Sequence, residues 1–86
     1  MKSVAKSIQM IAWFDTNGKV NPMKFKYEDE EESSSVVVID RIINRQLEKL
    51  AGNMMWKFTC SSKIEGVEST YDIKYDLING KWILFK

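Results

Sequence analysis

The stretch Tyr71–Phe85 reads YDIKYDLINGKWILF, and it decides the fold class. Apolar and charged residues alternate from Tyr71 to Leu77, which is the period of a β-strand with one buried face and one solvent face. The pair Asn79-Gly80 tolerates the positive φ angles of a two-residue type I′ turn, so we expect Lys81–Phe85 to return as an antiparallel partner. Because an isolated hairpin is only marginally stable in water, the rest of the chain must cover its apolar face.

The length and composition predict one small domain spanning residues 1–86. Cys60 is the only cysteine, so no intramolecular disulfide can form. The first residues lack the apolar segment of a secretory signal, and no apolar run approaches the ~20 residues of a membrane-spanning helix. We therefore expect a cytoplasmic protein that does not enter a membrane.

The sequence contains no histidine, which removes the usual general base, the histidine-dependent nucleophiles and histidine-ligated metal sites. Asp72 and Asp76 share a strand face with Lys74 between them, and Asp40 precedes Arg41. Carboxylates in such positions are usually surface salt-bridge partners rather than a catalytic pair. The chain also lacks a glycine-rich phosphate loop and a serine-centred elbow. We predict a protein that is not an enzyme, with no catalytic residue, no metal and no cofactor.

The formal charge of +1 conceals an uneven distribution, because five of the twelve acidic residues are consecutive, at Glu28–Glu32. The rest of the chain holds 13 basic and 7 acidic residues, a formal charge of +6. The segment 28–35 (EDEEESSS) has no apolar residue and is expected to be a solvated loop. A calcium loop would need glycine and spaced acids, and an acidic flap over the basic body is a further alternative.

Two further strands are expected in the N-terminal part, at residues 8–14 and 23–27, joined by a turn at Asp15–Gly18. The first carries apolar residues on both faces near its end, a pattern compatible with cover on two sides. Pro22 begins the second, and because proline has no amide hydrogen, its pairing should be loose, bulged or at a sheet edge.

The run Trp13–Phe25 (WFDTNGKVNPMKF), taken with residues 51–53 (AGN), 58–60 (FTC), 71–75 and 81–84 (KWIL), resembles a group of short, uncharacterised bacterial proteins. In that group a W-F pair, a glycine turn, a proline and an aromatic residue open a small domain, and an aromatic strand followed by K-W-x-L closes it. The resemblance implies an all-β fold and a bacterial source. It implies no activity or ligand, because the shared residues belong to turns and core.

The segment Val36–Leu50 (VVVIDRIINRQLEKL) is compatible with two periods. Its apolar residues follow a helix-like spacing of three and four, but Val36–Ile39 is a β-branched run that favours a strand. We predict a strand over Val36–Ile43, with a short helical turn near residues 44–50 as an option. A helix over the whole segment would instead give a sheet with one packed helix.

Residues 54–60 alternate as another strand, with Trp56, Phe58 and Cys60 inward and a turn at Glu65-Gly66 beyond it. Cys60 is expected to be a buried, unreactive thiol. Short strands separated by turns predict an all-β fold, a small antiparallel six-stranded meander that forms a barrel or a curled sheet. The predicted inward residues are Ile8, Met10, Phe14, Phe25, Tyr27, Val37, Ile39, Trp56, Phe58, Tyr71, Ile73, Tyr75 and either Trp82 with Leu84 or Ile83 with Phe85.

Function is predicted only as a class, a small binding module that acts in protein interaction or regulation. An apolar patch near Trp13, Trp82 or Phe85 would bind a protein partner or a second copy of the chain as a homodimer. The alternative is single-stranded nucleic acid on a basic sheet face, although the isoelectric point of about 7.8 is low for that role. The candidate surface consists of Lys24, Lys26, Arg41, Arg45, Lys57 and Lys74, with Trp13 and Trp82 as stacking rings. Binding requires these residues to cluster.

Overall fold

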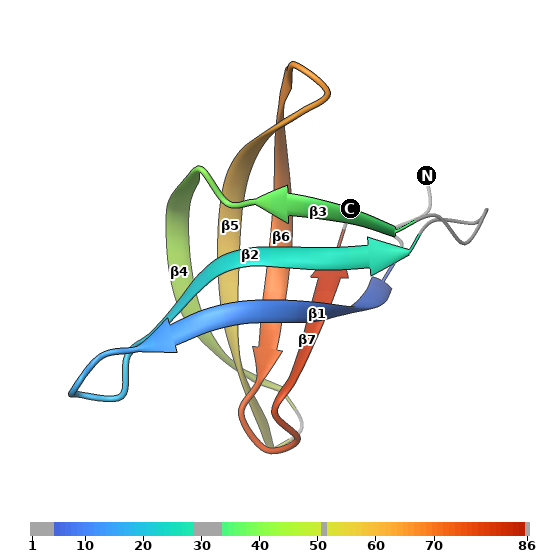
Figure 1. Ribbon diagram of the computed structural model, residues 1–86. Helices are drawn as coiled ribbons and strands as arrows, with labels where there is room; N and C mark the ends of the chain where they lie inside the picture. The colour runs from blue at the N-terminus through green and yellow to red at the C-terminus, as the bar shows by residue number, and fades with distance from the viewer. Residues whose placement is uncertain (1–4, 29–33, 51, 86) are drawn as a thin grey trace.

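A computed structural model describes residues 5–28, 34–50 and 52–85 (Figure 1). Within these ranges the chain forms seven strands and no helix, which confirms the all-β class. All pairings are antiparallel, and the strand order is β3-β2-β1-β7-β6-β5-β4. The strands are β1 (Ala5–Phe14), β2 (Val20–Glu28), β3 (Ser34–Val38), β4 (Arg41–Leu50), β5 (Asn53–Ile64), β6 (Val67–Asp76) and β7 (Lys81–Phe85).

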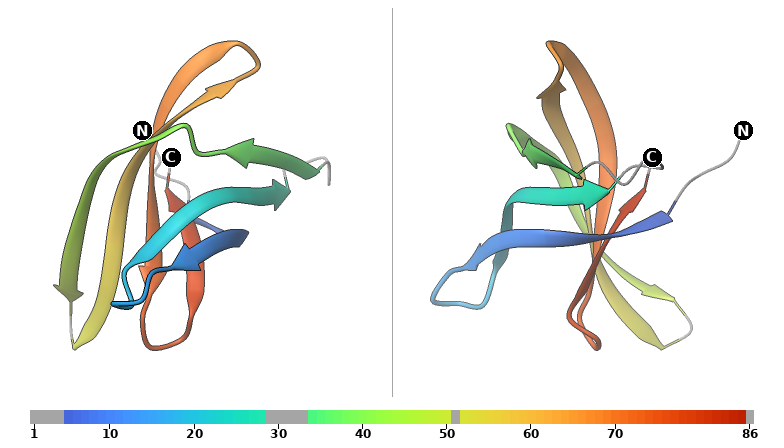
Figure 2. Two further views of the ribbon diagram at one scale, coloured as in Figure 1. Left: turned by 60° about the vertical axis from the view of Figure 1, so that its left-hand side comes forward. Right: turned by 45° about the vertical axis from the view of Figure 1, so that its right-hand side comes forward.

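Strand β1 changes partner along its length, and this change curls the sheet. Its first part, Ala5–Ile8, pairs with β7, whereas Gln9–Phe14 pairs with β2. As a result β1, β2 and β3 run across the other four strands, as Figures 1 and 2 show from three directions. The fold is a half-barrel, in which one sheet folds over to cover its own apolar face.

A β-bulge lies where Pro22 enters the sheet, which is one of the three alternatives predicted from the sequence. Ile11 pairs with Lys24, but the next residue, Ala12, pairs with Pro22, so Met23 is the extra residue in β2. A proline cannot donate a ladder hydrogen bond, and a bulge is one of the few places in a sheet that tolerates it.

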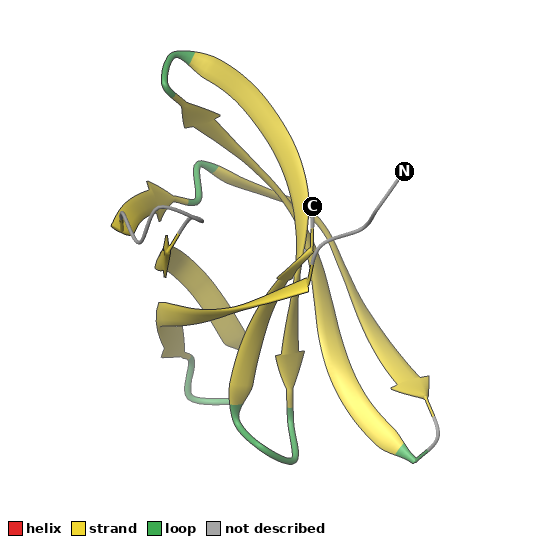
Figure 3. Ribbon diagram, turned by 90° about the vertical axis from the view of Figure 1, so that its right-hand side faces the viewer, coloured by secondary structure: helices red, strands yellow, loops and turns green. Residues whose placement is uncertain are grey.

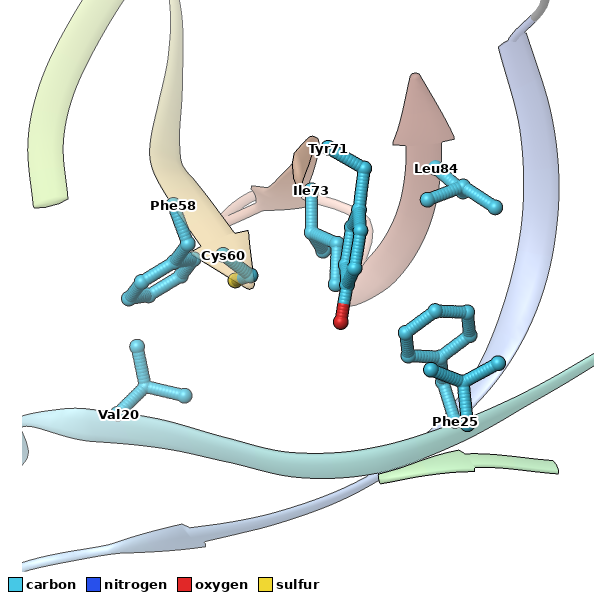
Figure 4. Packing of buried hydrophobic residues seen from close by; sticks show 8 residues of the cluster. Val20, Phe25, Phe58, Cys60, Tyr71, Ile73 and Leu84 are labelled. Atoms are coloured by element: carbon cyan, nitrogen blue, oxygen red, sulfur yellow. The ribbon is translucent and has the colours of Figure 1, made fainter. Parts of the chain in front are cut away.

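The core lies between the crossed halves of the sheet (Figure 4). Phe25 from β2 faces Tyr71 from β6 with ring centroids 5.5 Å apart, and Phe58 and Ile73 are fully buried. The buried apolar residues are Val20, Phe25, Val37, Phe58, Cys60, Tyr71, Ile73 and Leu84. Val20 is the one member of this set that the sequence did not predict.

The structure resolves the ambiguity in the last strand in favour of Trp82 and Leu84. Leu84 is buried, and Trp82 stacks on Phe58 with ring centroids 6.0 Å apart. Phe14, predicted to be inward, is 54% exposed and only its edge contacts Tyr75, with 6.3 Å between the ring centroids. It lies at the rim because it is the last residue of β1, beside the exposed turn to β2.

The C-terminal hairpin is confirmed, but its predicted two-residue turn is wrong. The last pair of the ladder is Asp76 with Lys81, which leaves a four-residue loop, Leu77–Gly80. The Asp76 carboxylate accepts hydrogen bonds from the amides of Ile78 and Asn79 and from the Asn79 side chain, and this cap stabilises the longer loop.

The two-residue turn with two positive φ angles occurs instead at Glu65-Gly66. These residues have φ values of 52° and 80°, and they are flanked by the pair Ile64 and Val67. This is the geometry of a type I′ turn, which the right-handed twist of a hairpin favours.

The interpretation of residues 36–50 needs correction. The predicted strand over Val36–Ile43 is broken, because β3 ends at Val38 and β4 begins at Arg41, so the sheet has seven strands rather than six. The optional helical turn is wrong, because β4 continues as a strand through residues 44–50. Asp40 makes the corner, because its amide donates to the Ser61 carbonyl and its carboxylate accepts from the Lys63 amide. A bulge between Ile42 and Asn44 then shifts the alternation. The strand break and the bulge each interrupt the two-residue alternation of a strand. For this reason the apolar residues of the segment follow a helix-like spacing without forming a helix.

The connection between β2 and β3 is shorter than the loop predicted over residues 28–35. Glu28 is the last residue of β2, and Ser34 and Ser35 begin β3. Residues 29–33 lie outside the described residues.

Candidate interaction surface

The clearest candidate site is the outer face of β1–β3, the side that points away from the core. Alternation along each strand creates it: Met10, Phe25 and Val37 pack in the core, so their neighbours in sequence point outward. We define the outer face by six of its exposed members, Ile11, Trp13, Lys24, Lys26, Val36 and Val38. Gln9 and Glu28 are exposed on the same face.

Strand register arranges most of these side chains in two rows. In one row Ile11, Lys24 and Val38 are direct cross-strand neighbours. In the next row the neighbours are Gln9, Lys26 and Val36, and directly opposed side chains lie about 5 Å apart at Cβ. Each lysine therefore has a valine of β3 beside it. A shallow depression of about 330 Å³ lies among the side chains of both rows.

The apolar residues on this face are well exposed. The exposed fractions are 63% for Val36, 57% for Ile11 and Val38, and 51% for Trp13. Scattered exposed apolar residues are common on protein surfaces, but a group of four on one sheet face is typical of an interaction site.

The two lysines of the outer face have no ion-pair partner among the described residues. Lys24 and Lys26 are both exposed, and no described carboxylate lies within 4.0 Å of either ammonium group. Their charge therefore remains available to a ligand.

The other predicted basic residues do not join this cluster. Lys57 lies 3.9 Å from Asp72 on the outer side of β5 and β6. Lys74 lies 3.0 Å from the Glu48 carboxylate on the same side of the sheet and 5.0 Å from the ring centre of Phe85. Their charge is offset by the neighbouring carboxylates.

Arg41 begins β4 and lies 4.0 Å from Glu68 with its side chain 69% exposed, which is a weak surface pair.

Arg45 and Trp82 were predicted to lie on the binding surface, but both side chains are half-buried. The Arg45 guanidinium lies 5.3 Å from the ring centre of Phe58 and donates hydrogen bonds to the Val20 carbonyl and the Asn21 side chain. Trp82 packs against the core, 4.6 Å from Tyr75 between ring centroids. Arg45 lies on the core side because the bulge in β4 resets its alternation.

The carboxylates considered for acid-base chemistry have structural partners. Asp72 accepts a hydrogen bond of 2.9 Å from the Thr59 hydroxyl, and Asp76 caps the loop before β7. Hydrogen bonds from Asn79, first its side chain and then its amide, hold the pKa of Asp76 below its usual value. In the described ranges no three metal-ligating side chains lie together.

Burial dominates the chemistry of the two titratable groups in the core. It raises the pKa of the Cys60 thiol to about 12 and the pKa of the Tyr71 phenol to about 12. The Tyr71 hydroxyl is hydrogen-bonded to the buried Ser62 hydroxyl. Both groups are therefore neutral at physiological pH and part of the packing.

Three residues of the outer face were missed by sequence reasoning, namely Ile11, Val36 and Val38. Ile11 gave a signal, because residues 8–14 carry apolar side chains on both faces. Val36 and Val38 gave one too, because the predicted inward direction of Val37 and Ile39 places Val36 and Val38 on the opposite face of the strand.

Comparison with known proteins gave no match among protein-family models, curated proteins or solved structures. None of the described segments forms a helix that could cross a membrane.

Proposed function

We propose that this protein is a small, non-enzymatic interaction module that binds a protein partner through the outer face of β1–β3. A single observation carries the proposal: four exposed apolar side chains surround two lysines without ion-pair partners among the described residues, all on one sheet face. Interfaces are enriched in aromatic residues near their centre, and Trp13 would serve in that way.

The energetic scale fits a moderate affinity. Complete burial of a valine or isoleucine side chain contributes roughly 1.5–3 kcal/mol, and the four apolar residues of this face are about half exposed before binding. Their burial would contribute several kcal/mol, which must exceed the entropic cost of association. Contacts to Lys24 and Lys26 would add specificity more than affinity.

The test is partner capture from the source cells followed by reconstitution with the purified partner. The double substitution Ile11→Ser with Trp13→Ser should weaken binding at least tenfold, whereas Ile78→Ser should leave it unchanged. Ile78 is a suitable control because it is 68% exposed in the loop before β7, away from the outer face. A partner whose affinity ignores the double substitution would contradict the proposal.

Self-association is tested with the same variants. Sedimentation velocity over a concentration series detects a homodimer, and a dimer of the outer face should dissociate when Trp13 and Ile11 are replaced by serine. A dimer that persists in this variant would use another surface.

Single-stranded nucleic acid is the second candidate, and one observation favours it. Trp13, Lys24 and Lys26 lie on the same face and are exposed, which combines a stacking ring with phosphate-binding charges. Against it, Lys57 and Lys74 lie close to carboxylates on a different face.

Fluorescence anisotropy with labelled single-stranded DNA and RNA at two salt concentrations tests this alternative. Salt-sensitive binding that Lys24→Glu with Lys26→Glu abolishes would favour nucleic acid over protein.

A further inference from the structure

Strand β3 lies at one edge of the sheet, and its backbone groups on that edge have no strand partner among the described residues. The Ile39 amide donates to the Met23 carbonyl, which fixes the phase of the ladder. In an antiparallel pair the hydrogen-bonded residues alternate, so Val37 pairs through hydrogen bonds with β2 while the amides and carbonyls of Val36 and Val38 point outward. Neither valine makes another hydrogen bond within the described part of the chain.

The edge of β3 is also unprotected by its sequence. Ser34–Val38 (SSVVV) contains no charged residue and no proline, the features that usually prevent an edge strand from pairing with another chain. The opposite edge, β4, carries Arg41, Arg45, Glu48 and Lys49 along its ten residues. Of the two edges, β3 is therefore the one suited to accept another strand.

A groove runs along this edge. The tip of the β5–β6 hairpin extends past β3, as Figures 1 and 3 show from two directions. The groove between them measures about 540 Å³, and its walls are residues 35–38 of β3 on one side and residues 63–65 of the hairpin on the other. Tyr27 and Val37 line its apolar part. The groove exists because β4 pairs with β5 only as far as Ser61, so beyond the corner at Asp40 the last residues of β5 have no strand partner on that side among the described residues.

We propose that this groove binds an extended peptide segment of the partner, which pairs with β3 as an additional strand. This inference rests on the proposed function, since it specifies how the partner approaches the outer face. The added strand would lie along the free edge of β3, beside the tip of the β5–β6 hairpin, and the outward backbone groups of Val36 and Val38 would supply its hydrogen bonds.

Strand alternation specifies the apolar side of the peptide. Side chains on its inner face would meet Val37, Tyr27 and the half-buried Ile64, so they should be apolar.

The outer face of the peptide should be acidic. Its side chains would lie beside Val36 and Val38, one strand away from Lys24 and Lys26. Because these lysines lack ion-pair partners among the described residues, carboxylates at the outer positions complement the surface. At the far wall Lys63 and Glu65 carry opposite charges, and the Asp40 carboxylate is occupied by the Lys63 amide. The occupant is therefore a segment in which apolar and acidic residues alternate.

The probe is a labelled, capped peptide of alternating valine and glutamate, compared with the same residues in two blocks and with a valine–lysine alternative. We expect the alternating acidic peptide to bind at least tenfold more tightly than either control. The amide signals of Val36 and Val38 should shift and gain protection from hydrogen exchange, while that of Ile78, in the loop before β7 and away from the groove, should not.

Two substitutions at one position separate backbone pairing from side-chain contact. Val36→Pro removes an outward amide without removing a ladder hydrogen bond to β2, and it should weaken peptide binding at least tenfold. Val36→Thr keeps the amide and the branched shape, and it should change binding less than twofold. The amide shifts in the wild-type protein provide the test if Val36→Pro fails to fold.

The inference and the proposed function can fail separately. Peptide or partner binding that depends on Ile11 and Trp13 but leaves the Val36 and Val38 amides unprotected would overturn strand addition and retain the interaction surface. Binding that protects these amides but ignores the outer-face substitutions would support strand addition without that surface. Absence of binding by the alternating peptide in any form would overturn the inference.

Discussion

The guanidinium of Arg45 donates a hydrogen bond of 3.1 Å to the carbonyl oxygen of Val20, joining β4 to β2, two strands that are not neighbours in the sheet. A side chain thus connects β4 to the second strand from the opposite edge, and no ladder joins these two strands in the described part of the chain. Replacing Arg45 by methionine should destabilise the protein by about 1–3 kcal/mol, because the Val20 carbonyl loses its partner. Urea denaturation measures the change, and Arg41→Met, at an exposed and weakly paired position, is the matched control with an expected effect under about 0.5 kcal/mol. Equal effects of the two substitutions would contradict this role of Arg45.

The cap at Asp76 makes stability depend on pH in the acidic range. Hydrogen bonds to its carboxylate lower the pKa in the folded state, so the charged form stabilises the fold. That stabilisation is present above the unfolded-state pKa of 3.8 and is lost as the pH falls through the lower folded-state value. Asp76→Asn should lower the urea midpoint at neutral pH, and the difference from wild type should shrink in acid. A constant difference across the acidic range would show that the carboxylate charge is not involved.

Glu65 should be a site where a substitution stabilises the protein. Its φ angle of 52° is the one positive value among the described non-glycine residues, and a residue with a Cβ pays up to about 1–2 kcal/mol there. Asparagine in this position would complete an Asn-Gly type I′ turn, the preferred pair, so Glu65→Asn should raise the free energy of unfolding by up to about 1 kcal/mol. Glu65→Gln is the control, since it removes the charge but retains the strain. If the glutamine variant gains as much, the gain comes from charge rather than backbone conformation.

Cys60 should be inert to thiol reagents while the protein is folded. Its thiol is buried and its pKa is raised to about 12, so the reactive thiolate is scarce. At about pH 8 labelling should proceed only as fast as the protein opens and should become rapid in denaturant. Rapid labelling of the native protein would contradict the buried position of the thiol.

Ionisation of Tyr71 should lower the free energy of unfolding at alkaline pH. Its pKa rises from 10.0 to about 12 on folding, so the unfolded state releases the phenolic proton first. The free energy of unfolding should therefore be unaffected by this group below the unfolded-state pKa and fall progressively between pH 10.0 and about 12. Tyr71→Phe should flatten this alkaline limb, although it also removes the hydrogen bond to Ser62. An unchanged slope would assign the alkaline loss to other groups.

Most of the fold could be predicted because its strands alternate clearly and its turns contain glycine. The hairpin of β6 and β7 and the inward direction of Phe58 and Tyr71 follow from local sequence, and the irregular pairing at Pro22 does so as one of three alternatives. The corner at Asp40 could not be predicted, because its hydrogen bonds to Ser61 and Lys63 join residues far apart in the chain.

The candidate surface was predicted only in part, for a similar reason. Lys24, Lys26 and Trp13 are indeed exposed on one face. The partners of Lys57, Lys74 and Arg45 depend on strand register and on a bulge, which a single sequence does not specify.

The change of partner along β1 has a consequence for how the protein is made. The ladder between β1 and β7 joins the first strand to the last, whereas all the other ladders join strands that are consecutive in the chain. On the ribosome β1, β2 and β3 emerge before β7 and can pair with one another, but the strand that ties them to the other half follows the other six strands. Throughout synthesis, the nascent chain therefore displays both the apolar side that will become the core and the side that carries Trp13. The half-barrel cannot close before β7 is available, because Ala5–Ile8 find their strand partner only there.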